Sequence, residues 1–94
     1  MTLVAMNQFG RTLTDREFGK SVAATILKNY PFPVTLDFKG VISLGSSCGD
    51  EIINVIIGKQ GAKLRVLNAN QAIMACLEKV ALDSKITVSF DLDP

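Results

Sequence analysis

Residues 45–58 read GSSCGDEIINVIIG, and whether this stretch forms a strand or a helix decides the fold. Most of the side chains at positions 52–57 are β-branched, which by itself favours a strand. The flanking residues favour a helix, because two serines and two acids precede the apolar run and glycines close it. We therefore predict a largely buried helix over residues 48–60.

Four segments on either side of this helix show strand patterns. Apolar and polar side chains alternate in residues 34–38 (VTLDF), 63–67 (KLRVL) and 86–90 (ITVSF), as they do in strands with one buried face. Residues 3–6 (LVAM) form a short apolar run compatible with an opening strand. Residues 41–44 fit either a loop or a bent continuation of the second strand.

Two further segments carry helix signals. Thr14 and Glu17 have the spacing of a capping box, and the helix that they begin should end at about Asn29, before two prolines. Asn68 or Asn70 can cap a third helix. The resulting order, β-α-β-α-β-α-β, implies neighbouring parallel strands joined by helical crossovers, so we predict an α/β fold.

The composition indicates one folded domain. The chain has 94 residues, of which 48% are hydrophobic and 20% charged, and its mean hydropathy is +0.30. A chain of this size builds a single core, and its apolar content excludes a disordered chain.

Charge and hydropathy restrict the partners. Ten basic and nine acidic residues are dispersed along the chain, and without a basic stripe we expect no nucleic-acid partner. No apolar run reaches the ~18 residues of a membrane span, and residues 1–9 lack the charged start of a signal peptide. We therefore expect no membrane partner and a cytoplasmic location. Cys48 and Cys76 are too few for a disulfide scaffold and fit a reducing compartment.

The absence of some residue types restricts the chemistry. The chain has no histidine, which excludes Ser-His-Asp and Cys-His catalysis and histidine-containing zinc sites. Two cysteines cannot supply a four-thiolate site, and the motifs GxxxxGK[ST] and GxGxxG of nucleotide-binding loops do not occur. We expect a protein that is not an enzyme and that holds no metal or cofactor.

Four short motifs, which together span about residues 10–82, resemble those of one family. They read LTDREFG at 13–19, LDFKGV at 36–41, SSCGDE at 46–51 and VLNAN at 66–70. The arrangement resembles the bacterial STAS-like domain family of unknown function, and more distantly the STAS domains of anti-sigma-factor antagonists. Cys48 stands where the STAS-like family usually has phenylalanine, and Gly45 where the antagonists have aspartate.

The resemblance implies a fold and a mode of action. The fold would be a single STAS-like domain, with a four-stranded, mixed but mainly parallel sheet and about three helices. Such domains act by protein–protein contact, and in antagonists a histidine-kinase-like ATPase phosphorylates a serine that corresponds to Ser47, beside Ser46. We therefore expect a regulatory module with a protein partner, which docks around residues 43–52 and the neighbouring helix.

Each of these residues also has a simpler interpretation. The two serines can cap the helix that they precede, since serine is a preferred N-cap. Cys48 beside a helix N-terminus could have a lowered pKa, but we expect a small buried or half-buried residue, since free cysteines are commonly buried. Asp37 has no paired carboxylate, so we expect a solvent-facing residue or one that binds a loop. Arg16 is either a partner contact or an ordinary exposed charge.

A second hypothesis is a sensor of a small anion or a nucleotide. The ligand would lie at the helix N-terminus after residues 45–50, near Ser47 and Asn68, where first-turn amides favour an anion. Asn68 and Asn70 follow a strand and could line such a cleft, or they could be only turn and cap residues. Asp50 and Glu51 would repel an incoming phosphate there. Homo-oligomerisation is compatible with either hypothesis.

Overall fold

The chain folds into two layers, a parallel sheet and a layer of helices. The computed structural model describes residues 2–92. Its main sheet has four strands in the order β1-β3-β5-β6, and a two-stranded sheet pairs β2 with β4. The elements are β1 (Thr2–Ala5), η1 (Met6–Phe9), β2 (Thr12–Leu13), α1 (Arg16–Asn29), β3 (Val34–Asp37), β4 (Ser43–Leu44), α2 (Ser46–Gln60), β5 (Lys63–Leu67), α3 (Gln71–Ser84) and β6 (Thr87–Asp91).

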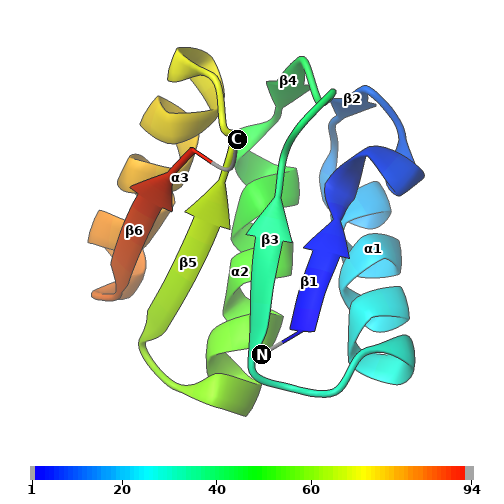
Figure 1. Cartoon of the computed structure of the whole chain (residues 1–94), viewed down its shortest axis with the longest axis vertical. Helices are drawn as coiled ribbons and strands as arrows, with labels where there is room; N and C mark the ends of the chain where they lie inside the picture. Colours follow the sequence, from blue (N-terminus) through cyan, green and yellow to red (C-terminus); the bar gives the residue numbers. More distant parts are fainter. Residues whose placement is uncertain (1, 93–94) are drawn as a thin grey trace.

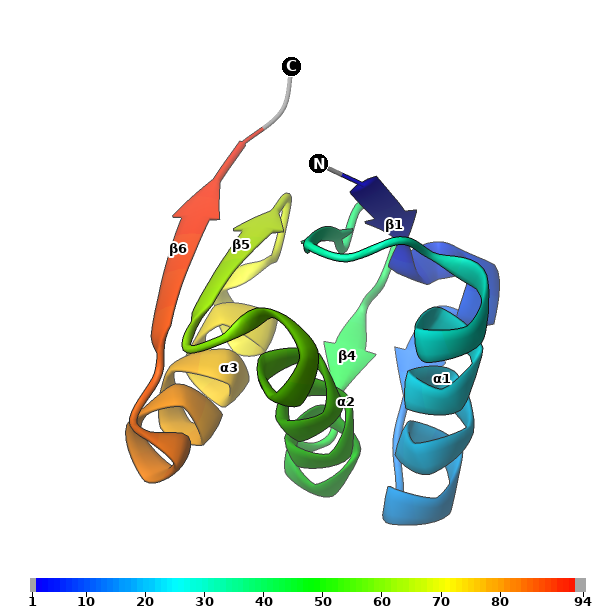
Figure 2. The same ribbon diagram turned by 90° about the horizontal axis from the view of Figure 1, so that it is seen from below.

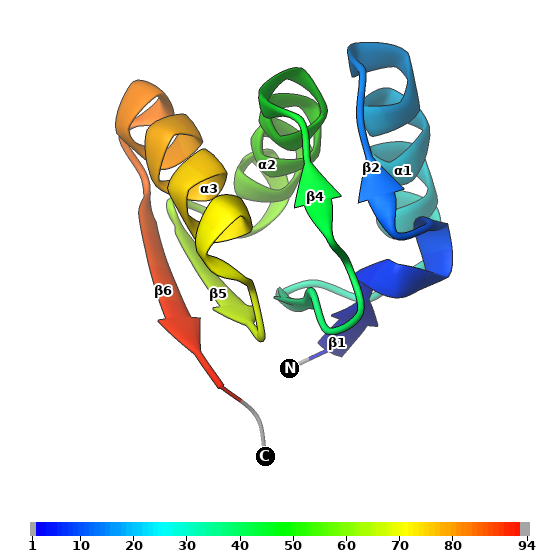
Figure 3. The same ribbon diagram turned by 90° about the horizontal axis from the view of Figure 1, so that it is seen from above.

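All three helices cover the same face of the main sheet (Figures 1, 2 and 3). The chain steps from β1 to β3, β5 and β6 in one direction, with one helix in each crossover. Because strand-helix-strand crossovers share one hand, steps in one direction place every helix on one side. The opposite face of the sheet is left without a covering layer, and α2 lies between α1 and α3 (Figure 2).

The predicted α/β class, with a four-stranded sheet and three helices, is confirmed. One detail differs, because every ladder among residues 2–92 is parallel and the sheet is not mixed. Helical crossovers connect all four strands of the main sheet, so no hairpin turn reverses the chain within it. The small β2·β4 pair, in the segments just before α1 and α2, was not expected from the sequence.

The decisive stretch is a helix, as predicted. α2 begins at Ser46, two residues earlier than expected, and ends at Gln60. Its inner face buries Ile52, Ile53 and Ile56. Burial of these large side chains against the sheet and the neighbouring helices outweighs the weak preference of β-branched residues for strands.

The predicted cap of α1 is wrong by one residue. The helix begins at Arg16, and its N-cap is Asp15, whose Oδ1 accepts a hydrogen bond of 2.7 Å from the Phe18 amide. Leu13 is held extended in β2, where its carbonyl accepts the Gly45 amide at 2.8 Å. The helix therefore starts too late for Thr14 to reach its first turn.

The backbones of α1 and α2 approach each other closely at Gly19. A Cβ atom at this position would lie 2.7 Å from the Cys48 carbonyl oxygen and 2.8 Å from the Cys48 Cα. Both atoms belong to the backbone of α2, which cannot rotate away. Only glycine therefore allows the two helices to pack at this separation.

Gly19→Ala should lower the free energy of unfolding by about 1–3 kcal/mol, because the added methyl group overpacks the α1–α2 contact. Gly58→Ala is the matched control, since a Cβ at Gly58 meets no atom within 4 Å. The control should gain up to about 1 kcal/mol from helix propensity. Urea unfolding of both variants measures the difference, and equal stability of the two would contradict the close contact.

Candidate functional site

Several of the predicted site residues meet at the N-terminal end of α2. The guanidinium of Arg16, in the first turn of α1, reaches across to α2. Its Nη1 lies 2.7 Å from Glu51 Oε2 and 3.6 Å from Asp50 Oδ2. Arg16 is therefore anchored on α2, which favours a functional or structural role over that of an isolated exposed charge.

A shallow depression of about 220 Å³ lies beside this ion pair. It is lined by Arg16, Ser46, Ser47, Asp50, Lys79, Val80 and Asp83; together with Glu51, these residues are called the α2 surface below. The third helix thus contributes a cation and an acid that the sequence motifs do not single out. The signal was present, since Lys79 and Asp83 are four residues apart on the polar face of α3.

The two serines do not cap α2. Its N-cap is Gly45, which makes no side-chain cap hydrogen bond, and the first helical hydrogen bond runs from the Gly49 amide to the Gly45 carbonyl at 2.8 Å. The capping interpretation of Ser46 and Ser47 is therefore wrong. Both residues occupy the first turn instead, where their hydroxyl groups are not needed to hold the helix.

The two acidic residues of α2 lie further along the helix than expected. Asp50 and Glu51 are outside the first turn, which holds no acidic residue. Asp50 Oδ1 accepts a hydrogen bond of 3.0 Å from Asn54 Nδ2, and Glu51 pairs with Arg16. Asp50 follows Ser46 by four residues and Glu51 follows Ser47 by four, so each carboxylate lies one turn further along the same face of the helix as a serine.

Asp37 and Asn68 come together, but away from the α2 surface. Asn68 Nδ2 donates to Asp37 Oδ1 at 3.0 Å, and the same oxygen accepts the Lys39 amide at 2.9 Å. Asn68 has a φ of 59°, a conformation that asparagine tolerates better than most residues. Asp37 therefore binds a loop, which was one of the two roles expected for it.

Asn70 has two structural bonds. Its Oδ1 accepts the Ile73 amide at 2.8 Å, which makes it the N-cap of α3, and its Nδ2 donates to the Ile42 carbonyl at 2.8 Å. Neither Asn68 nor Asn70 lines the depression beside Ser47. The depression beside Ser47 is thus formed without Asn68, the second residue on which the sensor hypothesis rests.

Cys48 is a core residue. Its side chain is fully buried, and it lies in the part of α2 that Gly19 contacts. Burial, with smaller contributions from Asp15 and Cys76, raises the pKa of the Cys48 thiol from 9.0 to about 11. Burial also raises the pKa of Cys76. The protonated thiol dominates at neutral pH, which is the opposite of what a nucleophilic cysteine needs.

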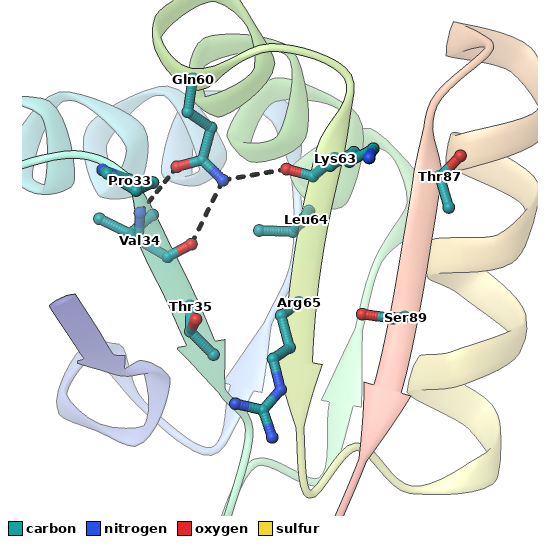
Figure 4. A pocket seen from close by; sticks show the side chains of 9 residues that line it. All are labelled: Pro33, Val34, Thr35, Gln60, Lys63, Leu64, Arg65, Thr87 and Ser89. Atoms are coloured by element: carbon teal, nitrogen blue, oxygen red, sulfur yellow. Dashed lines mark hydrogen bonds between the residues drawn. The ribbon is translucent and has the colours of Figure 1, made fainter. Parts of the chain in front are cut away.

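A larger depression, of about 460 Å³, lies on the open face of the sheet (Figure 4). Gln60 holds its upper wall: its Oε1 accepts the Val34 amide at 2.7 Å, and its Nε2 donates to the Lys63 carbonyl at 3.1 Å. Arg65, which also lines it, pairs through Nε with Asp91 Oδ2 at 2.9 Å. Its main polar groups thus brace strands against each other, and the sequence motifs point to none of them.

Comparisons of the chain with protein-family models, with curated proteins and with solved structures find no match. Within residues 2–92, no helix is both long and apolar enough to span a membrane. The same part of the chain contains no group of three or more cysteine or carboxylate side chains placed to hold a metal ion.

Cys48 should react slowly with iodoacetamide in the native protein. A pKa of about 11 instead of 9.0 leaves roughly a hundredfold less thiolate at pH 8, and burial blocks access as well. Mass spectrometry of the labelled peptides, with urea-unfolded protein as the control, measures the rate. Native labelling as fast as in urea would show that Cys48 is accessible and reactive.

The raised thiol pKa also predicts a pH dependence of stability. A group whose pKa is higher in the folded than in the unfolded protein stabilises the fold at pH values below the unfolded pKa. This contribution to the free energy of unfolding is lost as the pH rises through the folded pKa. The part due to Cys48 should therefore be complete below pH 9 and decline between pH 9 and about 11. Cys48→Ala should flatten this decline in urea unfolding curves recorded across that range.

Ser46→Ala and Ser47→Ala should each change the free energy of unfolding by less than about 0.5 kcal/mol, because neither hydroxyl caps α2. Asn70→Ala, which removes a real cap, should cost about 1 kcal/mol. Thermal unfolding of the three variants checks the contrast. A loss from Ser47→Ala as large as that from Asn70→Ala would restore the capping role.

Proposed function

We propose that this chain is a non-enzymatic regulatory module that docks a protein partner through the α2 surface. Phosphorylation of Ser47 by a histidine-kinase-like ATPase, the class implied by the STAS-like resemblance, releases the partner. The observation that carries the proposal is that Ser47 lines a polar depression together with Arg16 and Lys79 while having no capping role. Two free cysteines fit action in the cytoplasm.

The first turn of α2 suits contact with another protein. Gly45, Ser46 and Ser47 carry small side chains, so an approaching surface can reach the backbone amides that precede the first helical hydrogen bond. Ser46 is exposed and Ser47 is half-buried. A kinase can therefore reach one hydroxyl directly and the second at the rim of the depression.

The charges of the α2 surface explain how a phosphate would act as a switch. The surface carries two cations, Arg16 and Lys79, and the carboxylates of Asp50, Glu51 and Asp83. It has one net negative charge before modification, and a phosphate adds about −1.5 to −2. The added charge repels an acidic or apolar partner face.

Arg16 gives the switch a second state. In the unmodified protein it pairs with Glu51 at 2.7 Å. A phosphate on Ser47, which lines the same depression, competes with that carboxylate for the guanidinium, since it carries about −1.5 to −2 charge and three strong acceptor oxygens. Withdrawal of Arg16 from Glu51 would change both the shape and the charge that a partner meets.

The remaining chemistry supports binding over turnover. The chain has no histidine to act as a general base, and burial raises the pKa of the Cys48 thiol to about 11. Arg16, Asp50 and Glu51 of the α2 surface bind one another. A docking surface needs only such fixed charges and accessible backbone.

Incubation with ATP and a purified ATPase of the histidine-kinase-like class should phosphorylate Ser47. Ser47→Ala should abolish the modification, whereas Ser46→Ala and Ser21→Ala should retain it, Ser21 being an exposed serine on α1. Peptide mass spectrometry locates the phosphate. Modification of Ser46 or Ser21 with Ser47 untouched, or none at all, would contradict the proposal.

Binding of the same ATPase tests the docking surface separately. Ser47→Asp should weaken binding at least tenfold, the equivalent of about 1.4 kcal/mol, whereas Ser47→Ala should bind as the unmodified protein does. Lys28→Glu, on the exposed last turn of α1, changes charge elsewhere and should have little effect. Equal binding by wild type, Ser47→Ala and Ser47→Asp would remove Ser47 from the interface.

A further inference from the structure

The outer edge of β6 is an open strand edge. β6 is the last strand of the main sheet and pairs only with β5 (Figures 1 and 2). The Thr87 amide donates to the Ala62 carbonyl at 2.8 Å, and the Asp91 carbonyl accepts the Asn68 amide at 2.9 Å. Because backbone groups alternate in direction along a strand, the N–H and C=O groups of Val88 and Phe90 point outward from the sheet.

Apolar side chains flank this edge on the helix side. Ile86, Val88 and Phe90 are only partly buried there, and Leu82 and Leu92 are 79% and 83% exposed. These two leucines have the largest exposed fractions among the large hydrophobic residues of the described chain. The edge thus combines unpaired backbone groups with an uncovered apolar border.

The border also contains a hollow. A depression of about 320 Å³ between α3 and β6 is lined by Glu78, Ala81, Leu82, Ile86, Thr87 and Val88. Leu92 lies beyond the other end of β6, beside Phe90 and Met74. One end of the edge therefore carries a hollow and the other a projecting leucine.

We propose that two copies of this chain pair through β6, antiparallel, around a twofold axis at Ser89. This register places Val88 opposite Phe90 of the second copy, and the outward groups of these residues then form four backbone hydrogen bonds. It also places Leu92 opposite Ile86 of the second copy, at the hollow beside Leu82. The hollow and the leucine that fills it thus belong to the same surface, as a twofold interface requires.

The open face of the sheet agrees with this register. Ser89 meets itself on the axis, and Thr87 lies opposite Asp91, so a hydroxyl group faces a carboxylate and no like charges face each other directly. Both copies contribute to one continuous eight-stranded sheet. The α2 surface, formed mainly by the middle helix, stays uncovered, so this interface goes beyond the proposed function and does not depend on it.

The association should be weak. One short strand edge with two leucines is smaller than the roughly 1,200 Å² interfaces of stable complexes, and Glu78 lines the hollow, so the dimer gathers two carboxylates at one interface. We expect a dissociation constant on the order of 100 µM. Sedimentation equilibrium should show a mass that rises from 10.1 kDa towards twice that value with concentration.

Leu82→Lys and Leu92→Lys should each weaken this dimerisation at least tenfold, because they place a charge in the apolar border. Leu27→Lys is the matched control, since Leu27 is 44% exposed on α1, the helix that connects β1 and β3 at the end of the sheet opposite to β6. It should dimerise as the wild type does. All three residues are surface-exposed, so the variants should remain folded, which circular dichroism verifies.

Cysteine cross-linking tests the register. In a Cys76→Ala background, Ser89→Cys should form a disulfide between copies on oxidation, because residues on the axis face each other at about 4.5–5.5 Å between Cβ atoms. Thr87→Cys should not, since the two copies of residue 87 lie on opposite sides of the axis. Both residues are exposed on the same strand.

Sedimentation that shows only a monomer up to about 1 mM, ten times the expected dissociation constant, would overturn the proposal. A peptide from another protein would then be the remaining candidate for binding to the β6 edge. A dimer that Leu27→Lys disrupts and Leu92→Lys does not would place the interface elsewhere. Cross-linking through residue 87 instead of residue 89 would overturn the register on which the fit of Leu92 depends.

Discussion

The constraint on which the structure depends is the constant direction of its crossovers. Each step along the main sheet goes to the next outer strand, so all three helices must share one face. That crowding makes α2 the central helix and forces it against α1, where Gly19 leaves room for the backbone of Cys48. Without a glycine at that point, α1 and α2 could not pack at this separation.

The same crowding forms the candidate site. α2 begins between its two neighbours, so Arg16 from α1 and Lys79 from α3 both reach the depression at its first turn. Glu51 then holds the guanidinium of Arg16 at 2.7 Å. The charges around Ser47 thus come from three helices that are distant in sequence, and the buried Cys48 next to it belongs to the packing beneath.

One-sided packing also leaves surfaces that a doubly covered sheet would not have. The far face of the sheet is braced by Gln60 and by the Arg65–Asp91 pair. The outer strand β6 keeps backbone groups that no element of the described chain covers. The helical face and the β6 edge are therefore available for different partners, the first for regulation and the second for self-association.

The sequence by itself determined the order of the three helices and of the four strands of the main sheet, and with it the α/β class, because hydrophobic periodicity and local stop signals such as Pro31 depend on near neighbours only. It could not decide the cap of α1, since the β2·β4 pairing that delays the helix to Arg16 is a contact between distant segments. The sequence also could not predict that Lys79 lines the same depression as Ser47 or that Asn68 does not. Those positions follow from how three helices pack on one face, which only the tertiary structure decides.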